Sequence, residues 1–100
     1  MKSRTKEGPI FKFRLYVAGE TLNSSQAVSN LNALCLTYLP DRHEIELVDV
    51  LRNPKRALKD QIFMTPTLVK FSPLPAGKII GTLNQTKPVL QALGIGTSAS

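Results

Sequence analysis

The chain of 100 residues contains one cysteine, one histidine and no tryptophan. The lone Cys35 cannot form an intramolecular disulfide, and one cysteine with one histidine cannot supply the four ligands of a structural zinc site. No apolar run approaches the roughly 20 residues that a membrane helix needs. The charged N-terminus has no apolar segment behind it of the kind found in signal peptides. We therefore expect a cytoplasmic protein with no membrane partner and no cofactor.

Motifs that carry catalysis are also missing. The sequence has no Cys-x-x-Cys pair, whose reactive thiolate is stabilised at the start of a helix, and no glycine-rich phosphate loop. Helical periodicity places Cys35 on an apolar helix face, where it is expected to be a small core residue. We predict no catalytic or metal-binding residue and no enzyme activity. A redox enzyme of the thioredoxin superfamily, dependent on Cys35, is the remote alternative.

Basic residues are abundant instead: lysine and arginine outnumber aspartate and glutamate, the formal net charge is +6 and the sequence pI is about 9.8. Such a balance first suggests nucleic-acid binding. However, most of the cations are scattered, and no alternation of aromatic and basic residues provides a stacking surface for bases. We therefore predict no nucleic-acid partner, and a basic surface that meets an acidic protein surface.

Hydrophobic periodicity predicts a single α/β domain with the element order β-α-β-α-β-β-α. The expected strands cover 11–17, 44–51, a third strand opened by Pro66 and running to Phe71, and 78–83. The expected helices are one capped by Asn23 and closed by Pro40, a short one opened by Asn53 and Pro54, and one capped by Asn84 or Thr86 and running to Leu93. The short helix should bury Ala57, Leu58 and Ile62. The domain spans 10–95, between a disordered basic leader at 1–9 and a flexible tail at 96–100.

The connections predict how the strands pair. Strand, long helix and strand form a βαβ unit with parallel strands, and the proline-rich turn at 72–77 predicts an antiparallel hairpin. This order is that of thioredoxin-like folds. A proline opening the third strand is where that fold places its cis-proline, so Pro66 is the candidate.

Three stretches resemble the KaiB family: 15–19 with Asn23 and Ser24, then 48–54, then 65–68 followed by 79–81. The resemblance covers about 11–95. It implies a non-catalytic regulator that binds a KaiC-like ATPase in a circadian-type timing system. A KaiA-like protein or a clock histidine kinase is implied as a further partner, and self-association into dimers or tetramers is expected. A homologue with a non-circadian role, such as stress adaptation, is the alternative.

The resemblance also implies two folds. One is thioredoxin-like, and the other is a tetramer-type fold with a rearranged C-terminal half. Gly81 matches a glycine of the fold-switching segment, and Thr82 stands where clock members carry an acidic residue. We assign Pro66, Gly81 and Thr82 to fold switching or the cis-proline. The predicted partner-binding residues are basic, apart from one asparagine: Arg14, Arg52, Asn53, Lys55, Arg56 and Lys59.

Overall fold

The computed structural model describes residues 8–96. Most of the expected leader, at 1–7, and most of the expected tail, at 97–100, lie outside the described residues. The elements are β1 (Phe11–Val17), α1 (Leu22–Tyr38), β2 (His43–Asp49), α2 (Pro54–Lys59), β3 (Thr67–Ser72), β4 (Gly77–Ile80) and α3 (Thr86–Leu93). The predicted order β-α-β-α-β-β-α is confirmed.

The strands form one four-stranded sheet in the order β2-β1-β3-β4. β1 is parallel to β2 across the α1 crossover, whereas β3 is antiparallel to both β1 and β4. Both predicted pairings are therefore confirmed. The fold is the thioredoxin-like one, and not the alternative with a rearranged C-terminal half.

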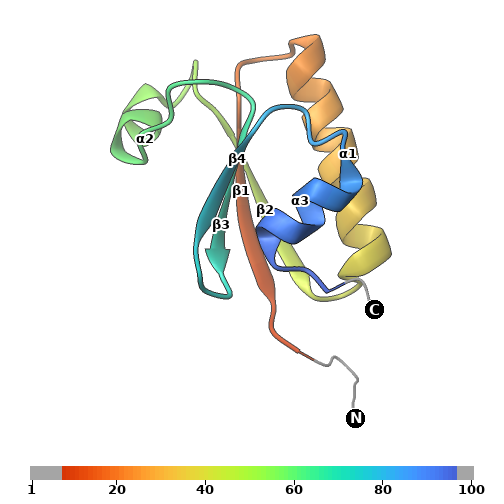
Figure 1. Ribbon diagram of the computed structural model, residues 1–100. Coiled ribbons are helices and arrows are strands. Elements are labelled where there is room, and N and C mark those ends of the chain that lie inside the picture. Colours follow the sequence, from red (N-terminus) through yellow and green to blue (C-terminus); the bar gives the residue numbers. More distant parts are fainter. Residues whose placement is uncertain (1–7, 97–100) are drawn as a thin grey trace.

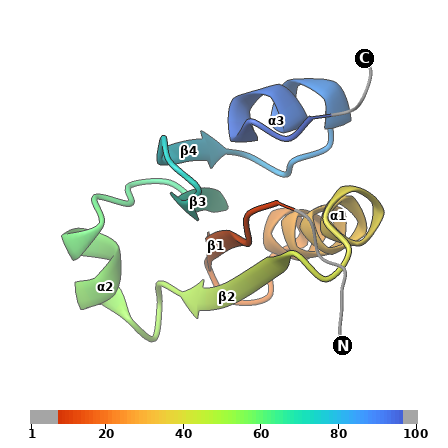
Figure 2. The same ribbon diagram turned by 90° about the horizontal axis from the view of Figure 1, so that it is seen from below.

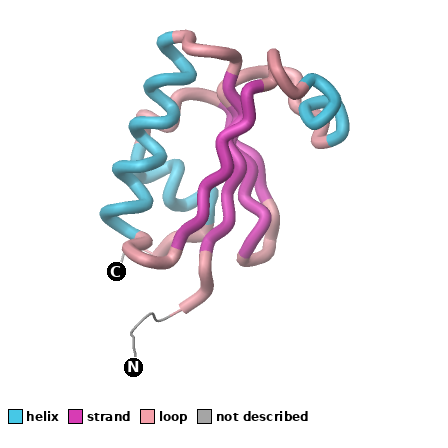
Figure 3. Tube along the Cα trace, turned by 180° about the vertical axis from the view of Figure 1, so that it is seen from behind, coloured by secondary structure: helices cyan, strands magenta, loops and turns pink. Residues whose placement is uncertain are grey.

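The helices cover the two faces of the sheet unequally (Figures 1 and 2). α1 and α3 lie on one face, and α2 lies alone on the other, at the end where β1 and β2 finish; Figure 3 shows this division from behind. The larger core lies under α1 and α3 and includes Phe13, Leu15, Leu31, Leu68 and Leu90. The smaller core lies under α2 and consists of Tyr16, Val48, Ala57, Ile62 and Val69.

The start of α1 differs from the prediction. Thr21, not Asn23, is the N-cap, and its hydroxyl accepts a hydrogen bond from the Ser24 N–H at 3.3 Å. The buried Ser24 hydroxyl in turn accepts the Ala18 N–H at 3.1 Å, which ties the first helical turn to the end of β1. The N-cap therefore lies two residues before the predicted one, and the helix begins at Leu22. Its predicted apolar face is confirmed at Leu31, Leu34 and Cys35, all of which are buried.

Two strands end earlier than predicted. β2 ends at Asp49 because its carboxylate accepts the N–H of Leu51 at 3.0 Å and turns the chain. β4 ends at Ile80 because Gly81 and Leu83 both have positive φ, at 123° and 65°, which a regular strand does not adopt.

Two expectations about the shorter helices were wrong. α3 begins at Thr86 with Gln85 as its N-cap and no capping side chain, so neither Asn84 nor Thr86 caps it. In α2, Ala57 is buried as expected and Ile62, just beyond the helix, is buried with it, but Leu58 is 69% exposed. Leu58 directly follows Ala57, and neighbouring residues of a helix point in different directions, so with Ala57 toward the sheet Leu58 points to solvent.

One lysine lies in the core beneath α3. Lys70 of β3 is buried, and its ammonium donates a hydrogen bond to the Leu93 carbonyl at 2.8 Å. A cation at this place is stabilised by the negative end of the helix dipole. α3 then ends at Gly94, which has a positive φ of 72°. Within residues 8–96, no helix has the length and apolarity required to cross a membrane.

Candidate partner-binding surface

Three loops meet at the end of the sheet where α2 lies, and Asp49 holds two of them together. Its Oδ1 accepts the N–H of Gly19 from the loop after β1 and the N–H of Leu51 from the loop after β2, each at 3.0 Å. Asn53 precedes α2 as predicted, but its side chain does not cap the helix. The Asn53 amide instead donates to the Asp49 carbonyl at 3.1 Å. Asp49 therefore fixes the position from which α2 begins.

Three of the predicted basic residues face solvent. Arg52 is 86% exposed at its side chain and lies 3.8 Å from the Asp49 carboxylate. Lys55 and Lys59 are exposed and form no ion pair with any residue in the described range. These three cations are accessible to a partner, together with the exposed Asn53.

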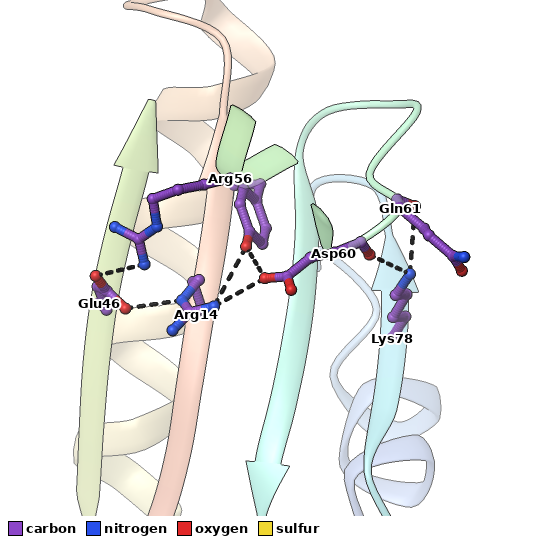
Figure 4. Close-up of polar contacts among 7 residues, drawn as sticks. Arg14, Glu46, Arg56, Asp60, Gln61 and Lys78 are labelled. Carbon is purple, nitrogen blue, oxygen red and sulfur yellow. Dashed lines mark hydrogen bonds and ion pairs between the residues drawn. The ribbon is translucent and has the colours of Figure 1, made fainter. Parts of the chain in front are cut away.

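Arg14 and Arg56 are instead engaged inside the molecule (Figure 4). Both donate to the Glu46 carboxylate, Arg14 at 2.7 Å and Arg56 at 2.8 Å. Arg14 also donates to the Asp60 carboxylate at 2.8 Å. The structure thus separates these two arginines from the other predicted partner-binding residues. They fasten α2 to the sheet.

Further hydrogen bonds complete this attachment, which we call the α2 clasp: Arg14, Tyr16, Glu46, Arg56, Asp60 and Lys78. The Tyr16 hydroxyl donates to Asp60, and the Lys78 ammonium donates to the Asp60 carbonyl at 2.8 Å. The Tyr16 hydrogen bond, followed by Arg14, holds the pKa of Asp60 below its ordinary value. Hydrogen bonds from Arg56 and Arg14 lower the pKa of Glu46 in the same way. Both carboxylates are therefore ionised at neutral pH.

Exposed apolar side chains lie on the same elements as the exposed cations. Leu51, Leu58, Phe63 and Met64 are 71%, 69%, 81% and 60% exposed, and all lie on α2 or on the loops that flank it. Thr67 holds the loop that carries Phe63 and Met64, because its hydroxyl donates to the Met64 carbonyl at 2.6 Å. Exposed apolar patches with polar rims are typical of protein interaction sites. We call Arg52, Lys55 and Lys59 with these four apolar residues the α2 surface.

The apolar part of the α2 surface was not predicted. Leu58 was expected in the core, and Phe63 and Met64 had no predicted role. Adjacent large apolar residues in a short segment between a helix and a proline were the available signal, because such a segment has little room to bury both.

The residues assigned to fold switching or the cis-proline lie close to one another. The Thr65–Pro66 peptide bond is cis, and the Pro66 carbonyl accepts the Gly81 N–H at 2.9 Å. The neighbouring Thr82 carbonyl accepts the Asn30 side-chain amide of α1 at 2.8 Å. This segment therefore connects the start of β3 to the end of β4 and to α1.

Cys35 lies apart from this end of the sheet. It is fully buried in the larger core, and burial raises the pKa of its thiol to about 11. A protonated, inaccessible thiol is a poor nucleophile. The stretch 19–24, where thioredoxins carry their reactive pair, contains no cysteine.

Comparison with known proteins identifies the family of this chain. The family model described as the KaiB domain matches residues 14–95. The chain is 42% identical over 82 residues to the circadian clock protein KaiB3 of Synechocystis, covering 82% of this chain and 80% of that one. It is 41% identical over 85 residues to the circadian clock oscillator protein KaiB of Acaryochloris marina, covering 85% and 82%.

Solved structures share the fold at lower identity. The N-terminal domain of SasA from Synechococcus elongatus has a TM-score of 0.69 and 18% identity, covering 100% of this chain and 98% of that one. A chloroplastic thioredoxin z has a TM-score of 0.70 and 18% identity, covering 85% and 76%. These similarities show a thioredoxin-like fold.

Proposed function

The chain belongs to the KaiB family of circadian clock proteins, and from this premise we propose that it is a non-catalytic regulator that binds a KaiC-like ATPase in a circadian-type timing system. The α2 surface is the observation that carries the proposal. It combines accessible cations with exposed apolar side chains at one end of the sheet. An acidic protein surface with apolar pockets is its complement.

The two kinds of residue have different roles in this proposal. Lys55 and Lys59 steer the encounter and contribute modestly to affinity, because exposed charge pairs are worth about 1 kcal/mol or less. Phe63 and Met64 supply the binding energy, because large apolar side chains that become buried at the centre of an interface dominate its stability. Arg14 and Arg56 act indirectly, by holding α2 in position.

The absence of catalysis is part of the proposal. Cys35 is the chain's single cysteine, and its thiol is buried and protonated. A cytoplasmic location, self-association into dimers or tetramers, and contact with a KaiA-like protein or a clock histidine kinase are further parts of it. A role in stress adaptation would use the same surface, but the activity of the partner would then show no circadian rhythm.

The test is binding of the purified chain to the KaiC-like ATPase of its own organism, with and without nucleotide, measured by biolayer interferometry. The double variant Lys55→Glu with Lys59→Glu should bind at least about tenfold more weakly, because two favourable charge contacts become repulsive. Phe63→Ala should lose a comparable amount. Lys12→Glu, which reverses an exposed charge on β1, is the matched control and should bind normally.

Two results would contradict the proposal. If the chain does not bind the ATPase in either nucleotide state, the partner is wrong. If it binds but the charge-reversed and Phe63→Ala variants bind as tightly as the parent, the α2 surface is wrong.

A further inference from the structure

The strand β4 forms one edge of the sheet, and a groove runs along it on the side away from the α2 surface. Within residues 8–96, no segment pairs with this edge. The groove has a volume of about 740 Å³ and lies between β4, the turn that follows it and α3. Ile79, Val89 and Ala92 give it an apolar lining.

The backbone of β4 offers hydrogen-bonding groups to this groove. The Gly81 N–H donates to the Pro66 carbonyl, so at Gly81 the backbone points toward β3. Backbone groups alternate in direction along an antiparallel strand. The N–H and C=O groups of Ile80 and Lys78 therefore point away from β3, along the free edge. An extended chain fits such an edge, because it can satisfy these groups by adding a strand.

The charges around the groove select the kind of chain. Lys78 is the only ionisable residue in the lining, but its ammonium is held by the Asp60 and Gln61 carbonyls on the α2 side. The available cation is the exposed Lys87 of α3, which lies in the sequence between the lining residues Gln85 and Pro88. The first turn of α3 has no acidic residue and no capping side chain, so the N–H groups of Thr86 and Lys87 are available to an anion, whereas Pro88 has none. A carboxylate near Gln85 would meet both the Lys87 ammonium and these N–H groups.

We propose that the β4 edge binds an extended segment of a partner protein that adds a fifth strand and carries a carboxylate toward the start of α3. Alternate apolar side chains of the segment enter the groove. A second copy of this chain is a poorer occupant: two β4 edges side by side would bring two Lys78 residues and two chains of net charge +6 together. The groove lies on the α3 side of the sheet and α2 lies on the opposite side, and no residue of the α2 surface lines the groove.

The probe is a set of random short peptides displayed on phage and selected on the immobilised chain. We expect the selection to enrich peptides in which apolar and polar residues alternate and an acidic residue stands near one end. A selected peptide is then synthesised with a fluorescent label, and its affinity is measured by anisotropy at several salt concentrations.

Two variants remove the site in different ways. Ile80→Pro deletes an outward N–H at an edge position that tolerates proline, and Ala92→Arg fills the groove from exposed α3. Each should weaken peptide binding at least about tenfold, and Lys87→Glu should weaken it most at low salt. Ile80→Val is the matched control. Circular dichroism establishes that each variant is folded.

Lys55→Glu on the α2 surface should leave peptide affinity unchanged, and Ile80→Pro should leave ATPase binding unchanged. A failure of peptide binding at the β4 edge can therefore be distinguished from a failure of ATPase binding at the α2 surface. Equal peptide affinity of Ile80→Pro, Ala92→Arg and the parent overturns the inference. So does a selection that yields no alternating acidic peptide. A dimer in sedimentation that Ile80→Pro dissociates would assign the edge to a second copy instead.

Discussion

Replacing Asp60 with asparagine tests how strongly the α2 clasp stabilises the fold. Asp60 accepts hydrogen bonds from the Tyr16 hydroxyl and from Arg14, and the Arg14 and Asp60 side chains are 24% and 26% exposed. Asparagine has the same size and can still accept one neutral hydrogen bond. The variant therefore removes the charge and leaves the packing in place.

The expected loss is about 2 kcal/mol of unfolding free energy at neutral pH. Exchanging a charged for a neutral acceptor at Tyr16 costs about 1 kcal/mol, because hydrogen bonds to ions are worth roughly twice neutral ones. Losing the partly exposed ion pair with Arg14 adds up to about 1 kcal/mol. For a domain of this size the melting temperature should fall by roughly 10 °C.

The pH dependence gives the more demanding test. The pKa of Asp60 is lowered in the folded state, so its contribution is present above the pKa of the unfolded chain, about 3.9, and is lost as pH falls through the lower folded value. The parent and Asp60→Asn should therefore differ most at pH 7 and converge in acid. The pKa of Glu46 is also lowered in the parent, by Arg56 and Arg14, and the substitution leaves both arginines in place, so the contribution of Glu46 should largely cancel in the difference.

The assay is urea denaturation followed by circular dichroism at a series of pH values, since the chain has no tryptophan. Asp41→Asn is the matched control. Asp41 is exposed, makes no ion pair within the described range and has a positive φ that asparagine also tolerates. A difference between the parent and Asp60→Asn that stays constant with pH, or one no larger than the control's, would refute the role given to the clasp.

Two further predictions concern residues away from the clasp. Cys35 should not react with a thiol reagent at pH 8 in the folded protein and should react fully in urea, because burial raises its pKa to about 11; rapid reaction without denaturant would contradict this. Gly81→Ala should lower the unfolding free energy by about 1–3 kcal/mol, because Gly81 has a φ of 123° that alanine rarely adopts although no atom lies near the added Cβ. A melting temperature equal to the parent's would show that this turn relaxes without cost.

The patterns that predicted the fold correctly are those with a strong period. β1 alternates between the large core and the α2 side, and α1 presents an apolar face over four turns. Both elements were therefore predicted correctly, and so was the parallel pairing of β1 with the strand that follows α1. Long elements leave few alternative arrangements once one face must be buried.

The errors arose where side-chain hydrogen bonds decide the ends of elements. Thr21 outcompetes Asn23 as a cap because Ser24 is held against the end of β1, a contact between segments that a local pattern does not contain. Asp49 ends β2 by accepting N–H groups from two loops. The ion pairs of two predicted partner-binding residues were missed for a related reason: Arg14 and Arg56 look like free cations until Glu46 and Asp60 are placed beside them.

The unequal cores on the two faces of the sheet have a consequence for binding. α2 rests on a core of five buried residues, whereas α1 and α3 share one of fifteen, so hydrogen exchange should show α2 opening at a lower free energy than the other helices. A partner on the α2 surface would bind only the closed form. Its apparent affinity would then include the opening equilibrium, and substitutions at Glu46 or Asp60 would weaken it without touching the interface once they lower the opening free energy enough to populate the open form.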